Sequence, residues 1–510
     1  MPASSLRFMD SPSVSSPATS GAATLLWFRK GLRLHDNPAL HAALEDTAAL
    51  YPVFVLDPAL LGLARVGVNR TAFLLETLRA LDAGLRERGS RLIVLRGEPL
   101  AELERVLVQW KINRLLYEAD TEPYANVRDA RAADLARRLG VELSSPGGHT
   151  LYDPGVLAEA AGGALPLSYG GFLKLVSRVG EPPAPLPTPE RLPPVGDLGQ
   201  PEGGRGVPTL AELGHHGKAA GLDFVTPGEQ GALTTLSGWT SAPARIASFE
   251  KPATDPSAYA PAATTRLSAH MKFGSLSART FYHALREAEQ AAGVHSQPPT
   301  SLVGQLLWRE MFTAVGAATP NYDRMVGNPV CRQIDWDDTP ALLSAWENGH
   351  TGYPWIDAAM RQLNAEGWMH HLARHSVACF LTRGDLWQSW EAGQGVFDRL
   401  LIDADWSLNA SNWMWLSASA FFTAIDRIYS PVAFPRKYPG ARAYVRHYLP
   451  ELAGVPDAFL LEPWTMTAAQ QRQAGCVLGR DYPLPVVEHA QARERNLSRM
   501  RAAYARARRG

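Results

Sequence analysis

The run Thr24-Leu25-Leu26-Trp27-Phe28 opens the pattern that decides the fold of this chain. Short apolar runs of the same kind recur at residues 49–56, 91–95 and 114–117. Longer stretches with helical periodicity lie between them, at residues 70–88 and 125–139. Strands that alternate with helices favour a parallel sheet covered on both faces. We therefore predict an α/β domain with a doubly wound parallel sheet over residues 24–150, preceded by a disordered tail at 1–23.

The second half of the chain shows helical periodicity without intervening strands. Helices are predicted at residues 280–292, 301–318, 341–347, 353–366, 370–382 and 396–402. Nine prolines fall within residues 181–208, a content that is typical of an extended surface segment. We therefore predict an interdomain linker at 151–227, an all-helical domain at 228–490 and a short basic tail at 491–510.

Composition narrows the class of protein. The chain carries 50 Lys and Arg against 50 Asp and Glu, which disfavours a wholly basic nucleic-acid binder but permits a local basic patch. Three cysteines without a CxxC pair disfavour a disulfide framework and a structural zinc site. No apolar run approaches the roughly 18 residues that a membrane span needs. We expect a soluble intracellular protein of a reducing compartment.

Two short motifs carry polar groups suited to chemistry. Hydroxyl side chains at Thr264, Thr265 and Ser268 suit a phosphate group, although the motif taken alone favours an ordinary helix cap. His371 and His375 are four residues apart and share one helix face. They could form a metal pair, lie as satisfied histidines in the core, or act as coupled imidazoles that donate a proton near neutral pH.

The stretch from Asp403 to Trp415 places two carboxylates and two amides among tryptophans. Buried carboxylates need partners, and we expect Arg374 to pair with Asp405. Helix caps and a polar turn would account for the same residues. Ten of the fourteen tryptophans lie between residues 308 and 415, which indicates either an aromatic core or an electron-transfer chain.

At these residues the sequence resembles the cryptochrome/photolyase family, and in particular its animal-type branch, which includes the (6-4) photolyases. The resemblance runs from Leu25 to about His489. Its most specific blocks are residues 304–310, 352–357, 368–384 and 403–422. It implies an antenna-type N-terminal domain and a helical FAD-binding domain.

The resemblance implies that FAD is held in a folded shape. Residues that match the family's phosphate loop are Thr264, Thr265, Leu267 and Ser268, and we expect Lys251 to reach the same phosphates. Residues that match the lining of the cofactor are Gln305, Arg309, His371 and Arg374. Asp403 and Asp405 match positions at its ribose and ring edge, and Asn409 matches the residue that faces flavin N5. An antenna chromophore, either a deazaflavin or a folate, is a further implication that no residue here decides.

The tryptophans then match a photoreduction chain. Its members are Trp413, Trp390 and Trp336, with Trp387 as the outer fourth member. The (6-4) lesion is favoured because the family's cyclobutane-dimer enzymes have Glu at the position of Gln305, and Asn and Met at those of His371 and His375. An electron from photoexcited reduced FAD would make a lesion radical anion, and an imidazolium, His375 as our first choice, would give it a proton.

The expected partner is UV-damaged DNA with a flipped lesion, bound by a monomer. Trp308 and Trp415 are expected to stack on the lesion, with Gln305 beside it. Arg436 and Lys437 are expected to touch DNA phosphates, although residues 430–440 depart from the family's usual pattern. The alternative is an animal-type cryptochrome that signals in blue light. A short stretch after His489 favours the enzyme, because cryptochromes commonly extend there. The compartment would be the nucleus or an organelle in a eukaryote and the cytoplasm in a bacterium.

Overall fold

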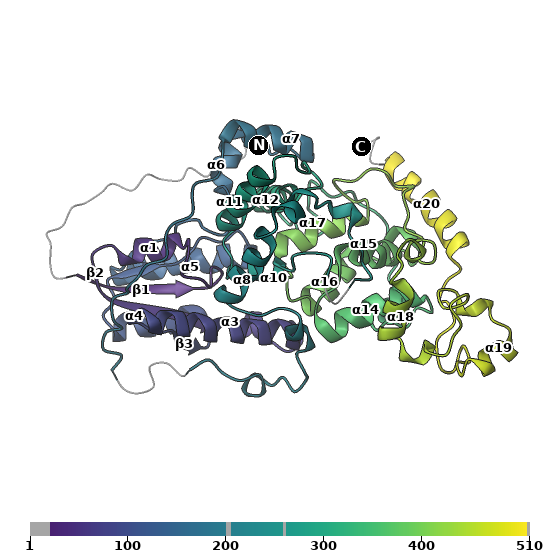
Figure 1. The fold of residues 1–510 in the computed structure, drawn as a ribbon. Coiled ribbons are helices and arrows are strands. Elements are labelled where there is room, and N and C mark those ends of the chain that lie inside the picture. Colours follow the sequence, from purple (N-terminus) through teal and green to yellow (C-terminus); the bar gives the residue numbers. More distant parts are fainter. Residues whose placement is uncertain (1–20, 200–205, 259–261, 507–510) are drawn as a thin grey trace.

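A computed structural model describes residues 21–199, 206–258 and 262–506 (Figure 1). Most of the predicted disordered tail lies outside the described residues. Its last two residues, Ala22 and Ala23, belong to the first strand, because their backbones pair with β2. None of the helices in the described ranges is both long and apolar enough to cross a membrane.

Five parallel strands form one sheet in the order β3-β2-β1-β4-β5. The strands are β1 (Ala22–Phe28), β2 (Thr47–Leu56), β3 (Ile93–Arg96), β4 (Arg114–Leu116) and β5 (Glu142–Ser144). β1 is the central strand, and its Leu26 lies opposite Pro52 of β2 and Leu116 of β4. This sheet confirms the predicted doubly wound α/β class.

Helices cover both faces of the sheet, since successive side chains of a strand point to opposite sides. Leu26 and Phe28 pack with α1 (Pro38–Leu44) and α3 (Val68–Glu87). Leu25 and Trp27 pack on the other face with α4 (Pro99–Gln109) and α5 (Pro123–Leu139). Burial on both faces explains why these strands read as continuous apolar runs rather than as an alternation.

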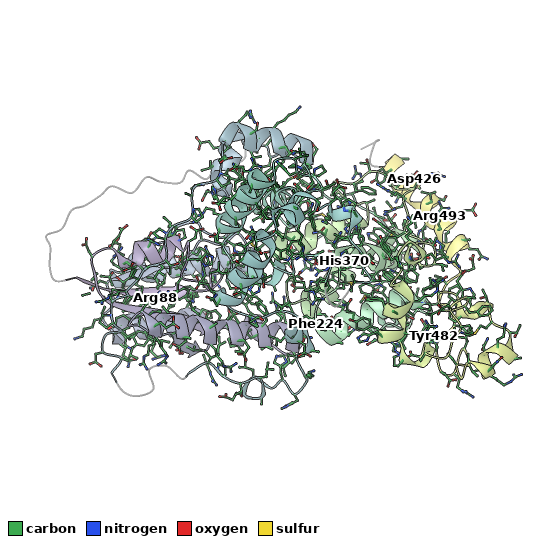
Figure 2. All side chains as sticks on the ribbon, in the orientation of Figure 1. Arg88, Phe224, His370, Asp426, Tyr482 and Arg493 are labelled. Atoms are coloured by element: carbon green, nitrogen blue, oxygen red, sulfur yellow. The ribbon has the colours of Figure 1, made fainter. Side chains whose placement is uncertain are left out.

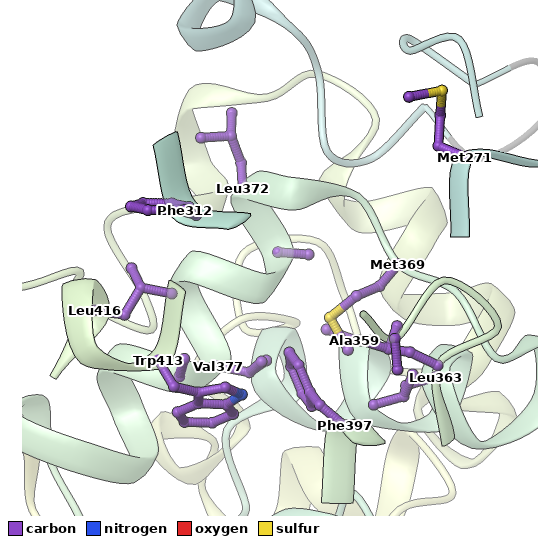
Figure 3. Packing of buried hydrophobic residues seen from close by; sticks show 14 of the residues in the cluster. Met271, Phe312, Ala359, Leu363, Met369, Leu372, Val377, Phe397, Trp413 and Leu416 are labelled. Atoms are coloured by element: carbon purple, nitrogen blue, oxygen red, sulfur yellow. The ribbon is translucent and has the colours of Figure 1, made fainter. Parts of the chain in front are cut away.

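The second half is helical and shares one continuous apolar core, part of which Figure 3 shows around Trp413 and Phe397. From residue 206 onward the described chain contains no strand beyond isolated bridges. The helices from α8 on are α8 (Glu229–Thr240), α9 (Pro243–Ala247), α10 (Ser268–Phe273), α11 (Ala278–Ala292), α12 (Leu302–Ala318), α13 (Pro340–Glu347), α14 (Pro354–Glu366), α15 (His371–Cys379), α16 (Trp390–Leu400), α17 (Trp406–Leu416), α18 (Ala441–Tyr448), α19 (Ala468–Gln473) and α20 (His489–Arg506).

The predicted linker at 151–227 is wrong over its first part. Helices α6 (Pro154–Ala160) and α7 (Tyr169–Val179) lie there, and Leu157 and Phe172 are buried in the core of the helical domain. The prolines that suggested a linker begin only at Pro182. Within this proline-rich segment the backbone runs along the α/β domain, where Leu50 N–H donates to the Pro194 carbonyl at 3.1 Å.

The predicted tail at 491–510 is also wrong for its described part. Residues up to Arg506 form α20, which lies at the opposite end of the molecule from the sheet (Figure 1). Met500 and Ala503 of this helix are buried against Trp387 and Ala418. The many arginines of the segment hide this narrow apolar stripe in the sequence. The stripe has a partner only in the tertiary structure, where it packs against the helical domain.

The two domains meet along a seam of buried charges and close backbone contacts. The fully buried Arg33 donates to the Gly274 carbonyl at 3.0 Å and pairs with Glu118 at 3.3 Å. Asp36, also fully buried, receives two hydrogen bonds from Arg279, at 2.6 and 3.0 Å. A Cβ on Gly274, which has a φ of +65°, would lie 2.2 Å from the backbone nitrogen of Gly31. The seam therefore requires glycine at this position.

Gly274→Ala should destabilise the protein more than the same change at an open left-handed position. We expect the free energy of unfolding to fall by about 2–5 kcal/mol, because backbone strain adds to the overlap with Gly31. Gly140→Ala is the matched control, since its φ is +69° and no atom lies within 4 Å of its added Cβ. That control should lose only about 1–2 kcal/mol. Urea unfolding followed by tryptophan fluorescence measures both, and equal losses would contradict the close approach of the domains.

Candidate active site

A central cavity opens within the helical domain and encloses about 1520 Å³ of empty space, part of it open to solvent. Every residue predicted to hold the cofactor lines it: Lys251, Thr264, Thr265, Leu267, Ser268, Gln305, Arg309, His371, Arg374, Asp403, Asp405 and Asn409. His375 and Trp413 line it as well. Helices α12, α15 and α17 each present side chains four residues apart to the cavity, which is the spacing of one helix face.

Arg374 forms a two-pronged ion pair with Asp403, at 3.1 and 2.9 Å. The expected pairing of Arg374 with Asp405 is therefore wrong. Asp405 instead caps α17, where its Oδ1 accepts from the backbone N–H of Leu408 at 3.2 Å. A capping carboxylate must face the first turn of its own helix, which turns it away from Arg374.

The surroundings of Asp405 favour its ionised form although the residue is buried. Burial by itself would raise the pKa of this carboxyl group. The nearby His149, whose Nε2 lies 3.9 Å from Asp405 Oδ2, and the charges of Lys272 and Lys30 lower it by more, so the pKa ends well below its ordinary value. His149 lies just beyond β5, and no motif in the sequence pointed to it. Arg309 also contacts this residue, because it donates to the His149 carbonyl at 2.9 Å.

Lys251 lines the central cavity as a cation without an ion-pair partner among the described residues. Within the described residues no carboxylate lies in ion-pair contact with its ammonium group. Burial first and then the charge of Arg374 lower its pKa to about 8. The hydroxyl-bearing residues Thr264, Thr265 and Ser268 line the same cavity. A half-buried cation without an anion, beside several hydroxyls, fits the phosphates of FAD.

The histidine pair lies at the start of α15. His370, labelled in Figure 2, caps this helix, and its Nδ1 accepts from the Leu372 N–H at 3.1 Å. His371 Nε2 is 3.1 Å from the Lys251 carbonyl, and the ring centroids of His371 and His375 are 5.9 Å apart. Tyr429, which the sequence did not single out, lies with its hydroxyl 3.4 Å from His375 Nδ1.

In the protein alone, the surroundings of both imidazoles disfavour their protonated forms. Burial is the largest cause, followed by the charges of Lys251 and His370, and together with Arg374 they lower the pKa of His375 to about 3. The pKa of His371 is lowered strongly for the same reasons. That one imidazole is protonated near neutral pH stays a prediction, and in the protein without bound anions the lowered pKa of each imidazole acts against it.

Three indole N–H groups of the predicted tryptophan chain are buried without a hydrogen-bond partner, those of Trp336, Trp390 and Trp413. Trp413 on α17 packs edge-on against Phe397 of α16, with ring centroids 5.0 Å apart (Figure 3). Trp336 and Trp387 are in ring contact at 4.8 Å. Trp387 is itself covered by α20, whose Arg499 lies 4.5 Å over its ring.

The residues predicted to bind DNA do not all lie at the central cavity. Gln305 lines it, and its amide donates to the Pro299 carbonyl at 2.6 Å. Trp308 and Trp415 contact each other at 5.1 Å, and Tyr169 of α7 stacks on Trp308 at 4.2 Å. These two tryptophans lie outside the cavity lining.

Arg436 and Lys437 are exposed in a short 3₁₀ turn, Pro435–Lys437, where Arg436 pairs with Glu462.

A second cavity lies at the carboxyl ends of β1, β2 and β4, and we call it the sheet-end cavity. It encloses about 1090 Å³ of empty space, part of it open to solvent. Its wall combines aromatic residues, Trp27 and Tyr124, with basic ones such as Arg29 and Lys30. The sheet order reverses between β1 and β4, which is where ligands of doubly wound sheets bind. This is a suitable place for an antenna chromophore.

Comparisons with known proteins agree with this geometry. The family model described as "FAD binding domain of DNA photolyase" matches residues 302–502, and the one described as "DNA photolyase" matches residues 24–190. The (6-4) DNA photolyase of Arabidopsis thaliana is 48% identical over 506 residues, with 96% of this chain and 90% of the relative covered. Cryptochrome-1 of Gallus gallus is 45% identical over 490 residues, with 95% and 78% covered.

Solved structures show the same architecture. A bacterial class III photolyase from Agrobacterium tumefaciens superposes with a TM-score of 0.80 at 28% identity, covering 97% of this chain and all of that one. The cryptochrome of Synechocystis sp. PCC6803 gives a TM-score of 0.82 at 26% identity, covering 94% of this chain and all of that one. Both the α/β domain and the helical FAD-binding domain are thus accounted for. The chain belongs to the cryptochrome/photolyase family.

Proposed function

We propose that this protein is a (6-4) photolyase, which uses light and FAD to repair (6-4) pyrimidine-pyrimidone photoproducts in DNA. The observation that carries the proposal is the pair His371 and His375, which line the central cavity one helical turn apart. Relatives that are named (6-4) photolyases in Arabidopsis thaliana and Oryza sativa are 48% identical over nearly the whole chain. We infer that the protein acts on damaged DNA as a monomer inside the cell, in the nucleus or an organelle of a eukaryote or in the cytoplasm of a bacterium.

Bound FAD would absorb the light and supply the electron for repair. The chain's own residues hold it: Lys251 and the hydroxyls of Thr264, Thr265 and Ser268 receive the phosphates. Asp403, held by Arg374, and Asp405, held by the first turn of α17, present fixed negative charges to the cavity. Asn409 is anchored through its amide group, which donates to the Gln394 carbonyl at 3.1 Å. A deazaflavin or a folate would occupy the sheet-end cavity as antenna.

A flipped lesion would enter beside Gln305 and the histidine pair. Trp308 and Trp415 would flank it, and Tyr169 already stacks on Trp308, so that indole is held in one orientation. Lys437 is available for a DNA phosphate, whereas Arg436 would first have to exchange Glu462 for the phosphate. DNA and FAD phosphates bring negative charge to the site, and this charge would raise the pKa of His375 toward the range in which it donates a proton.

Signalling as a cryptochrome is the second candidate. It is favoured by the 45% identity to cryptochrome-1 of Gallus gallus across 95% of this chain. The tryptophan chain suits either function, since both would use it to reduce the flavin.

Blue-light repair of two matched oligonucleotides, one with a (6-4) photoproduct and one with a cyclobutane dimer, tests the proposal. We expect repair of the first alone. In His375→Ala this repair should fall at least about 100-fold, the typical value of a positioned acid or base, while FAD binding and photoreduction persist. His350→Ala, an exposed histidine outside the cavity, is the matched control.

Each other outcome has a definite meaning. Normal repair by His375→Ala would reject this residue as proton donor. Repair of the dimer alone would show that Gln305, His371 and His375 are misassigned. Bound and photoreduced FAD without repair of either lesion would make the cryptochrome function the better one.

Trp413→Phe should slow photoreduction of the bound flavin sharply, because a phenyl ring is much harder to oxidise than an indole. Repair by flavin that has been reduced chemically should remain. Trp110→Phe is the control, since Trp110 is equally buried but lies in the α/β domain, stacked on Tyr51. Transient absorption measures the rate, and an unchanged rate in Trp413→Phe would remove this residue from the chain.

Lys251→Met should raise the pKa of His375 in the FAD-free protein, because the largest neighbouring positive charge is removed. A folded-state pKa of about 3, below the ordinary 6.5, means that the wild type loses stability as the pH falls through 6.5. Between pH 7 and 5 the low pKa of His375 alone reduces the free energy of unfolding by about 2 kcal/mol. The variant should lose less over that interval. Histidine NMR and urea unfolding at both pH values measure this, with exposed Lys218→Met as control. An unmoved pKa of His375 in Lys251→Met would contradict the assignment.

A further inference from the structure

Four charged residues form a half-buried network between the two cavities. Lys30 Nζ lies 3.0 Å from Asp120 Oδ1 and 2.5 Å from Glu122 Oε1. Lys272 Nζ lies 3.2 Å from the same oxygen of Glu122. Lys30 follows β1, and Asp120 and Glu122 lie between β4 and α5, where Glu122 is the N-cap of α5. Lys272 comes from α10 of the helical domain. One carboxylate oxygen thus joins an ammonium group from each domain.

Lys272 is placed to act on both sides of this network. It lines the sheet-end cavity together with Glu122 and Lys30, and it also lines the central cavity together with Asp405. The side chain of Lys272 is 16% exposed, so its charge is only partly screened by solvent. Its charge lowers the pKa of Glu122 on one side and that of Asp405 on the other, although burial pushes both upward.

The seam between the domains holds this arrangement in place. Lys272 is followed by Phe273 and Gly274, and the Phe273 carbonyl accepts from the Leu32 N–H at 3.1 Å. Lys30 precedes Gly31 on the other side of the same contact. The two ammonium groups therefore sit on the two backbones that meet at Gly31 and Gly274, so the position of Lys272 is set by the domain interface as well as by its own helix.

We propose that Lys272, which Glu122 holds in place and which lines both cavities, tunes the bound flavin by its charge. This rests on the proposed function, because it requires FAD in the central cavity. The proposal implies that Glu122 influences the bound flavin through Lys272, although Glu122 lines the sheet-end cavity and not the central one. Nothing in the recognised motifs assigns a role to either residue.

The test measures FAD affinity and the midpoint potential of the bound flavin by reductive titration of the holoprotein. In Lys272→Met the ratio of reduced to oxidised flavin at a fixed potential should fall about tenfold, which is a shift of about 30 mV for a two-electron couple. The reduced flavin is the more negative form, and the variant removes a positive charge near it. Lys272→Arg should stay within about twofold of the wild type, because it keeps the charge.

Glu122→Gln separates electrostatics from simple damage to the fold. It removes a negative charge, so the potential should move upward, opposite to Lys272→Met. The double variant Lys272→Met with Glu122→Gln should return close to the wild-type value. Lys218→Met, an exposed lysine paired with Asp223, is the matched control and should leave the potential unchanged.

A wild-type potential in Lys272→Met, or a shift of Lys272→Met and Glu122→Gln in the same direction, would overturn the proposal. If Glu122→Gln does not fold, the difference between Lys272→Met and Lys272→Arg decides alone. Such results would overturn the inference about Lys272 without contradicting the proposed repair function. A wild-type protein that binds no FAD would instead overturn the proposed function, and the inference with it.

Discussion

The contact between Gly31 and Gly274, with the buried charges around it, is the constraint on which the rest of the structure depends. Arg33 and Asp36 are fully buried, and each is satisfied by groups from both domains or from the chain segments beside them. Breaking such a pair would leave an uncompensated charge, which typically costs about 3–5 kcal/mol. The seam thereby aligns the carboxyl end of the sheet with α10, and with it the two cavities.

The charged residues of the central cavity are of two kinds, those that are paired within the protein and those that are not. Acidic residues are held by the protein itself, since Asp403 is paired with Arg374 and Asp405 caps a helix. Lys251 has no such partner in the part of the chain that the structure describes, and its charge adds to the effect of burial in lowering the pKa of His375. A site with excess positive charge, fixed carboxylates and aromatic walls is complementary to a dinucleotide with an anionic linkage. The capacity of this cavity to bind such a cofactor therefore follows from the positive charge of Lys251, which the fold leaves unpaired.

Much of the fold could be predicted because its determinants are local. Continuous apolar runs at residues 24–28 and 49–56 identify buried parallel strands, and helix periodicity located α3, α5 and α12 to within a few residues. Where the determinants are not local, the predictions were wrong. Helices α6 and α7 are short and depend on packing against α12. The apolar stripe of α20 is narrow and is buried only because it packs against Trp387. Arg374 pairs with Asp403 because Asp405 is taken by its own helix.

The amino-acid sequence by itself determined the class of the two domains, the family and the set of residues that would surround a cofactor. Periodicity and motifs are properties of neighbours in the chain, so they are readable without a structure. Only the tertiary structure decided which charges compensate one another, that burial and nearby cations lower the pKa of both imidazoles, and that Lys272 and Glu122 join the two cavities. These depend on distances between residues that are far apart in sequence, such as Glu122 and Lys272, and on burial, which sets how strongly such charges interact.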